Sequence, residues 1–229
     1  MFHDGINMKN ISEKNNFIYL TVSLVALLFV ASLVEQFPVK YGQHLVMMFT
    51  VITLISGTIG FRKSKLFLGV GSGLVVIVSV LLILTISLEE SGMHYLPIVI
   101  LIGFYLWATW LAAKNVLFCE QVDRNTIVGA ICLYLLIGLI WSLLYLFIAQ
   151  AVPGAFNGIA QGLWYENFSA LTYYSYVTLT TLGYGDISPV APVARFLVYM
   201  EAIVGVFYMA ILVASLISIR LADKQSGKQ

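Results

Sequence analysis

The sequence predicts an all-α integral membrane protein with six transmembrane helices and one shorter, re-entrant helix. The 229 residues are 60% hydrophobic and 10% charged, whereas soluble domains average about 25% charged residues. A water-soluble chain of this length cannot bury that much apolar surface. The formal net charge of +1 excludes a strongly basic nucleic-acid-binding protein, and two cysteines are too few for a disulfide framework.

The first half of the chain predicts a four-helix transmembrane bundle. Residues 1–16 are polar and are interpreted as a cytoplasmic N-terminal tail, and residues 17–113 form the bundle. Each of its apolar runs is near the roughly 20 residues that cross about 30 Å of hydrocarbon. Short links between the runs favour antiparallel neighbours. The runs cover residues 17–34, 41–61, 66–88 and 95–113.

We expect this bundle not to sense voltage in the usual way. A voltage sensor needs several positive charges within the membrane field, because each charge moved across 100 mV contributes only about 2.3 kcal/mol. The fourth run, residues 95–113, contains no Lys or Arg. Runs two and three contain no acidic partners for such charges.

The second half begins with a connector at residues 114–125, which we expect along the membrane surface. Residues 126–152 form a fifth apolar run, and the last one extends from about Val193 to Leu221. Between them, residues 168–180 are too few to span the membrane and indicate a re-entrant helix surrounded by protein or a watery cavity. Residues 222–229 predict a short cytoplasmic tail without a regulatory domain, so regulation would need the membrane, the pore-forming residues or an unidentified partner.

The most specific stretch runs from Thr178 to Asp186. Gly183 and Gly185 flank one residue, which indicates a backbone that enters positive φ, a region that only Gly occupies cheaply. A strand that alternates ordinary and mirror-image conformations turns successive carbonyls to the same side. Such a column of oxygens can replace the water around a dehydrated cation, and the Thr181 hydroxyl can add one more oxygen. The alternative is a simple glycine turn between two helices.

This stretch, TLTTLGYGD, resembles the selectivity-filter signature of the potassium channel family. The resemblance is specific from Trp164 to Leu221 and only architectural before that. It implies that K⁺ is the permeant ion and that the protein has the tetrameric cation-channel architecture, as a homotetramer. It also implies that residues 126–221 of each subunit form the outer helix, pore helix, filter and inner helix. It assigns the filter to Thr181, Leu182, Gly183, Tyr184 and Gly185, with K⁺ on the carbonyls of the first four.

The resemblance also implies that the side chains of Leu182 and Tyr184 pack behind the filter. The family commonly has Val where this chain has Leu182, so the degree of selectivity stays open. We expect filter support from Tyr173, Tyr174, Thr178, Thr180 and Glu201, although plain aromatic packing explains the tyrosines equally well.

Two residues of the last helix have alternative interpretations. A charge at the bilayer centre costs about 2.5–3.5 kcal/mol, so Glu201 should face protein or water; a structural hydrogen bond behind the re-entrant segment is favoured over a place in the ion path. Gly205 is either a bending point or a site of close packing. Ala210, Ala214 and Ile217 recur at helical spacing and are expected to line the inner entrance.

The basic residues predict the orientation. With a cytoplasmic N-terminus, six crossings place ten of the twelve Lys and Arg residues inside and leave Lys40 and Arg195 outside. Both termini are then cytoplasmic in a multi-pass protein of the cell membrane. Asp186 lies at the outer mouth, where a carboxylate concentrates cations.

These observations predict passive K⁺ conduction in a lipid bilayer, with no enzyme activity, no organic cofactor and no nucleic-acid partner. No nucleophile, base and orienting group cluster along the sequence. One alternative is a weakly selective cation channel in which Leu182 loosens the filter. Another is a non-conducting membrane protein whose first four helices bind a ligand or partner. A transporter subunit is less favoured, because such transporters usually carry four filter-like repeats in one chain.

Overall fold

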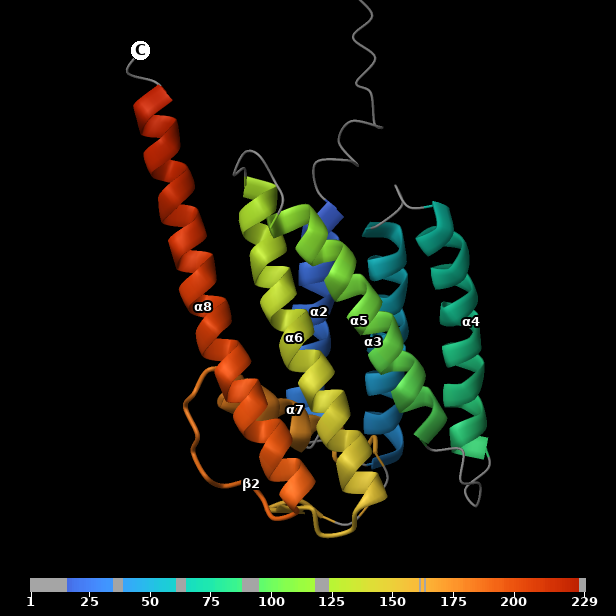
Figure 1. The fold of residues 1–229 in the computed structure, drawn as a ribbon. Coiled ribbons are helices and arrows are strands. Elements are labelled where there is room, and N and C mark those ends of the chain that lie inside the picture. Colours follow the sequence, from blue (N-terminus) through green and yellow to red (C-terminus); the bar gives the residue numbers. More distant parts are fainter. Residues whose placement is uncertain are drawn as a thin grey trace, which may run out of the picture.

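The computed structural model describes residues 16–34, 39–60, 65–87, 95–117, 124–160, 162 and 164–226. Within them the chain forms long helices, one short helix and two strands of two residues each (Figure 1). In chain order these are α2 (Asn16–Val34), α3 (Val39–Gly60), α4 (Lys65–Ser87), α5 (Tyr95–Leu117), α6 (Arg124–Ala151), β1 (Phe156–Asn157), α7 (Phe168–Leu179), β2 (Ser188–Pro189) and α8 (Pro192–Ser226).

The all-α class is confirmed, and each predicted apolar run forms a helix. Three helical stretches of the described residues are long and apolar enough to cross a membrane, namely Tyr95–Val116, Asn125–Ala151 and Pro192–Leu212. The apolar helices at Phe17–Leu33, His44–Gly60 and Gly69–Leu81 are shorter. Six crossings and the division into domains therefore stay predictions.

Two predicted boundaries were placed too early. Helix α5 continues past residue 113 to Leu117, since the Lys114 ammonium lies 5.8 Å from the centre of the Trp110 ring and can remain at the surface while the helix continues. Helix α8 includes residues 222–226, which the sequence analysis had assigned to a tail. The predicted tail at 1–15, the centre of the connector at 118–123 and residues 227–229 lie outside the described residues.

Helix α2 lies in the middle of the molecule and packs against α3, α6 and α7, while α4 and α8 lie at opposite edges (Figure 1). Leucines of α2 and α6 form much of the core, which includes Leu24 and Leu136. The hydroxyls of Tyr105 and Thr53 form a hydrogen bond of 2.8 Å inside the bundle. These two buried hydroxyls are thus paired with each other, whereas the buried Thr109 hydroxyl on α5 has no hydrogen-bond partner among the described residues.

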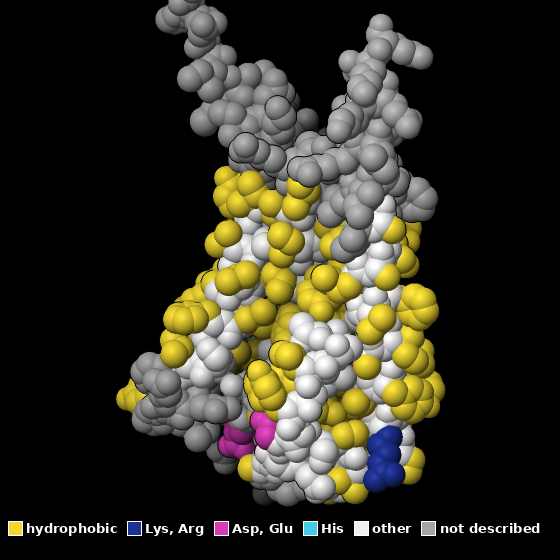
Figure 2. Space-filling view, turned by 90° about the vertical axis from the view of Figure 1, so that its left-hand side faces the viewer, with side chains coloured by type: hydrophobic (Ala, Val, Ile, Leu, Met, Phe, Trp, Pro, Cys, Tyr) yellow, Lys and Arg dark blue, Asp and Glu magenta, His cyan; other side chains and the backbone are white. Residues whose placement is uncertain are grey.

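The outside of the bundle is also hydrophobic. Tyr19, Val22, Phe29 and Trp110 are more than half exposed. Figure 2 shows many hydrophobic side chains on the face that it presents, and the acidic and basic side chains that are coloured on this face lie near one end. Helices that are apolar on all sides are typical of chains surrounded by lipid.

Candidate functional site

The segment that leaves α7 has an alternating backbone. Thr181, Gly183 and Gly185 have φ values of 60°, 57° and 84°, whereas Leu182 and Tyr184 between them have no positive φ. Positive φ at both glycines agrees with the expectation from the sequence. At Thr181 it was not expected, because a β-branched residue is strained there and needs its surroundings to hold it.

Two hydrogen bonds fix the direction of the first carbonyls. The N–H groups of Leu182 and Gly183 both donate to the carbonyl oxygen of Val177, at 2.9 and 3.4 Å. In a trans peptide the carbonyl points opposite to the N–H of the same unit, and the described residues contain no cis peptide. The carbonyls of Thr181 and Leu182 therefore both point away from α7, whereas those of an ordinary strand alternate.

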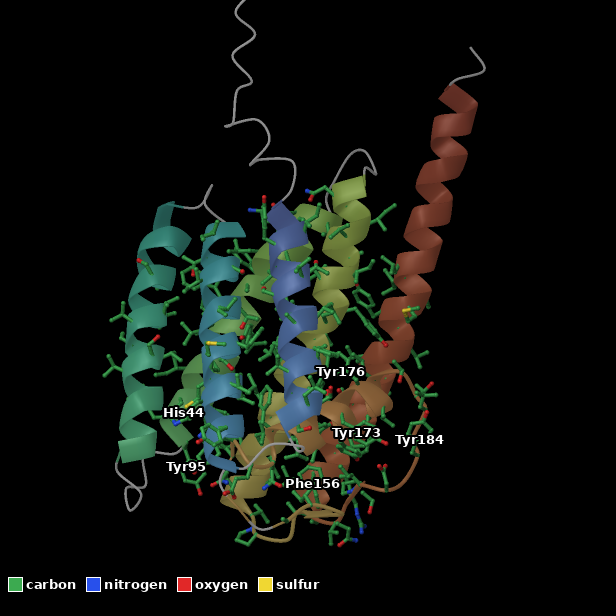
Figure 3. All side chains as sticks on the ribbon, turned by 180° about the vertical axis from the view of Figure 1, so that it is seen from behind. His44, Tyr95, Phe156, Tyr173, Tyr176 and Tyr184 are labelled. Carbon is green, nitrogen blue, oxygen red and sulfur yellow. The ribbon has the colours of Figure 1, made fainter. Side chains whose placement is uncertain are left out.

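The opposite side of this segment is open in the single chain. The side chains of Leu182 and Tyr184 are 60% and 67% exposed, so their predicted packing behind the filter is not provided by the same chain. Tyr184 lies on the loop at the α8 edge of the molecule (Figure 3). An open, mainly apolar groove of about 420 Å³ separates this loop from α8, with Val177, Val198 and Ala202 among its lining residues.

Helix α7 is held against α6 by side chains that face α6. The Tyr176 hydroxyl donates to the carbonyl of Leu135 at 2.6 Å, and the hydroxyls of Ser142 and Thr172 lie 2.9 Å apart. Gly138 makes room for the Tyr176 ring, since a Cβ there would lie 2.5 Å from a ring carbon. These contacts fix the helix from which the filter segment starts.

The end of α7 closes through Thr180. Its hydroxyl donates to the carbonyl of Tyr176 at 2.6 Å, and its N–H donates to the same carbonyl at 3.1 Å. Thr178 is buried in α7. Filter support by Thr178 and Thr180 stays a prediction.

Glu201 joins three helices. Its side chain is 0% exposed on α8. Its Oε2 accepts a hydrogen bond from the Tyr145 hydroxyl of α6, and its Oε1 lies 2.6 Å from the Ser175 hydroxyl of α7. Ser175 also lies 2.7 Å from the carbonyl oxygen of Gly138. Glu201 is therefore hydrogen-bonded to α6 and α7, and its role as filter support stays a prediction.

An aromatic cluster surrounds the same junction. The rings of Tyr145, Phe156 and Tyr174 lie with their centres 5.4 to 5.8 Å apart. They come from α6, β1 and α7. Tyr174 thus packs among aromatic rings, as one of the two interpretations of the tyrosines expects.

Gly205 lies where α8 meets the end of α7. A Cβ at this position would lie 2.1 Å from the carbonyl oxygen of Leu179 and 3.0 Å from its carbon. The Tyr134 hydroxyl donates to the same oxygen at 3.3 Å, and the Tyr208 hydroxyl donates to the carbonyl of Ala130. Helix α8 continues through Gly205, so this geometry favours close packing, and bending stays a prediction.

The C-terminal end of the segment is held by the loop that precedes α7. Strands β1 and β2 pair antiparallel, with Phe156 opposite Pro189. Gly158 has a φ of 84°, and a Cβ there would lie 2.2 Å from the carbonyl oxygen of Asp186. A hydrogen bond to the exposed Asp186 carboxylate raises the pKa of the Tyr173 hydroxyl. Neither the strand pair nor the position of Gly158 follows from the sequence, in which a glycine in the loop is the only signal for them.

The predicted inner-pore residues are not part of this cluster. The side chains of Ala210 and Ala214 are exposed on α8, and that of Ile217 lies outside the described side chains. No group of three or more His, Cys, Asp or Glu residues within the described part of the chain is arranged to hold a metal ion. The oxygen atoms at residues 181–186 are those of the backbone, the Thr181 and Tyr184 hydroxyls and the Asp186 carboxylate.

Residues 129–220 match a family model described as an ion channel. Over 95 residues the chain is 32% identical to "Inward rectifier potassium channel Kirbac3.1" of Paramagnetospirillum magnetotacticum. That match covers 42% of this chain and 29% of the relative. No solved structure matches the chain. The part of the chain that runs from α6 through α7 and the filter segment into α8 is thus similar to ion channels, a family of proteins that are not enzymes.

Proposed function

We propose that the chain is one subunit of a potassium-selective channel that conducts K⁺ passively through a homotetrameric pore. One observation carries the proposal: left-handed φ recurs at Thr181, Gly183 and Gly185, and the amides of Leu182 and Gly183 both bind back to α7. This arrangement leaves the carbonyls of Thr181 and Leu182 on the side away from α7. Carbonyl oxygens presented together can replace the hydration shell of a cation.

The need for other copies follows from the open side of the segment. One chain can place carbonyl oxygens on only one side of an ion. In the single chain the side chains of Leu182 and Tyr184 are also mostly exposed. A closed ring of identical subunits would complete the oxygen cage and cover these side chains. The resemblance to the potassium channel family supports four copies.

Potassium as the permeant ion rests on the TLTTLGYGD signature and on the name of the relative, which is a potassium channel. Thr181, Leu182, Gly183 and Tyr184 bind K⁺ through their carbonyls, and Gly185 allows the chain to leave the filter. Leu182 is the residue that would reduce selectivity in the alternative of a weakly selective cation channel. Sodium flux separates the two.

Gating by voltage of the usual kind is not part of the proposal. Helix α5, the counterpart of the fourth predicted run, carries Lys114 in its last turn and no basic residue before it. The proposed orientation keeps both termini in the cytoplasm of the cell and Asp186 at the outer mouth. The exposed Asp186 carboxylate then attracts cations to the entrance.

The test is tracer flux into liposomes that contain the purified protein. We expect uptake of potassium and rubidium, little uptake of sodium, and block by barium. Uptake of sodium equal to that of potassium would favour the weakly selective channel. Absence of all flux from a correctly assembled oligomer would favour the non-conducting membrane protein.

A further inference from the structure

We propose that Glu201 is held as the neutral carboxylic acid and that this form ties α6, α7 and α8 together behind the filter segment. Glu201 is a positioning residue here, because its hydrogen-bond partners Tyr145 and Ser175 lie outside the filter residues 181–185. Its connection with conduction rests on the proposed function, whereas its protonation state does not.

The hydrogen count around Ser175 is the first argument. Its hydroxyl carries one proton but lies 2.7 Å from the carbonyl oxygen of Gly138 and 2.6 Å from Oε1 of Glu201. A carbonyl only accepts, and an ionised carboxylate only accepts. With an ionised Glu201, one of the two contacts would therefore place two oxygens together without a proton between them.

A protonated Glu201 satisfies every contact. The acid donates from Oε1 to the Ser175 hydroxyl, and Ser175 donates to the carbonyl of Gly138. The Tyr145 hydroxyl donates to Oε2. The result is an unbroken chain of hydrogen bonds from α8 through α7 to α6, with a second bond from α6.

Among the described side chains, none near Glu201 carries a charge that could balance an ionised carboxylate. Glu201 is fully buried, and its partners are a serine and a tyrosine. Three further tyrosines interact electrostatically with Glu201, namely Tyr134 on α6 and Tyr174 and Tyr176 on α7. Strand β2, which packs against α8, consists of Ser188 and Pro189 and carries no charged side chain. The described basic side chains, those of His44, Lys114 and Arg195, are all exposed. An isolated buried charge is so unfavourable that the group normally neutralises.

Infrared difference spectroscopy of the purified protein near neutral pH tests the protonation state. We expect the carbonyl stretch of a protonated carboxyl group in the wild type, sensitive to deuterium exchange and absent from Glu201→Gln. The matched control is Glu166→Gln, which removes an exposed carboxyl of the outer loop and should leave the band in place. Identical wild-type and Glu201→Gln spectra in this region would overturn the proposal.

Flux tests the positioning role. Glutamine can donate to Ser175 and accept from Tyr145, so Glu201→Gln should keep rubidium flux within about twofold of the wild type, whereas Glu201→Ala should lose about tenfold or more. Raising the pH should ionise Glu201 and so lower wild-type flux more than the flux of Glu201→Gln. Because the nearby tyrosines are present in both proteins, this difference reports the ionisation of Glu201 alone. Ser175→Ala removes the proposed acceptor of the Glu201 proton and should therefore shift the carboxyl band in the infrared spectrum. This variant tests the proposed contact even if Glu201→Ala does not fold. Loss of flux in a folded Glu201→Gln would contradict the neutral acid.

A silent wild type would refute the proposed function and leave the infrared result to decide the protonation state. A flux-competent wild type without the band would refute the neutral acid alone. The two failures are therefore distinguishable.

Discussion

Replacing Gly205 by Ala tests how tightly α8 is packed on the end of α7. The added Cβ would lie 2.1 Å from the carbonyl oxygen of Leu179 and 3.0 Å from its carbon. An ordinary carbon–oxygen contact is about 3.3 Å or longer, so the backbones must separate by roughly 1 Å. Backbone cannot rotate aside as a flexible side chain does.

The expected cost follows from that displacement. Overpacking of a well-packed contact costs about 1–3 kcal/mol, from which the better helix propensity of Ala subtracts up to about 1 kcal/mol. The displaced carbonyl also accepts a hydrogen bond from Tyr134, so this bond is strained as well. We expect lower thermal stability, and reduced rubidium flux because Leu179 lies just before the filter segment.

The measurement is thermal unfolding of the purified protein in detergent, paired with flux in liposomes. Gly103→Ala is the matched control, since a Cβ at this helical glycine meets nothing within 4 Å. That variant should be as stable as the wild type or more so. Equal stability and flux in the Gly205→Ala and Gly103→Ala variants would refute the close-packing argument. Reduced flux at unchanged stability would support the bending alternative.

Three further substitutions act on the filter segment. Gly183→Ala adds a Cβ to a residue with a φ of 57°, which costs about 1–2 kcal/mol in each copy. We expect this variant to lose potassium flux, whereas size-exclusion chromatography should show that the oligomer still forms. Asp186→Asn should lower conductance mainly at low salt, because charges are screened over about 10 Å at 0.1 M; an effect that is independent of salt would mean a structural role. Gly158→Ala places a Cβ 2.2 Å from the carbonyl oxygen of Asp186, so it should destabilise the proposed outer mouth and reduce flux. Normal flux in this variant would show that the loop can rearrange to accept the Cβ.

The helices could be predicted because membrane helices are encoded by long apolar runs. Errors were confined to the ends, where local chemistry decides. The charge of Lys114 appeared to end a helix, yet its stem and its contact with Trp110 let α5 continue. Pro192 opens α8 because its missing N–H is not needed in the first turn.

The glycines of the filter segment could also be predicted, since Gly183 and Gly185 have few other uses at that spacing. The partners of the segment could not. Glu201 meets Ser175 and Tyr145, which are 26 and 56 residues away in the sequence. No periodicity within one helix encodes such pairs. The positive φ of Thr181 is likewise imposed by its surroundings and not by its type.

The contacts of α8 divide this helix into two parts. Its outer part is fixed by its own chain, through Glu201 on α6 and α7, Gly205 on Leu179 and Tyr208 on Ala130. Beyond Tyr208, the side chains of Met209, Ala210, Ile211 and Ala214 are exposed. Substitutions at Glu201 or Gly205 therefore act on α7 through contacts within one chain. Because Ala210 and Ala214 are exposed among the described side chains, we expect substitutions there to act through lipid, an aqueous cavity or a second copy. Their effects should then depend on assembly in a way that those at Glu201 and Gly205 do not.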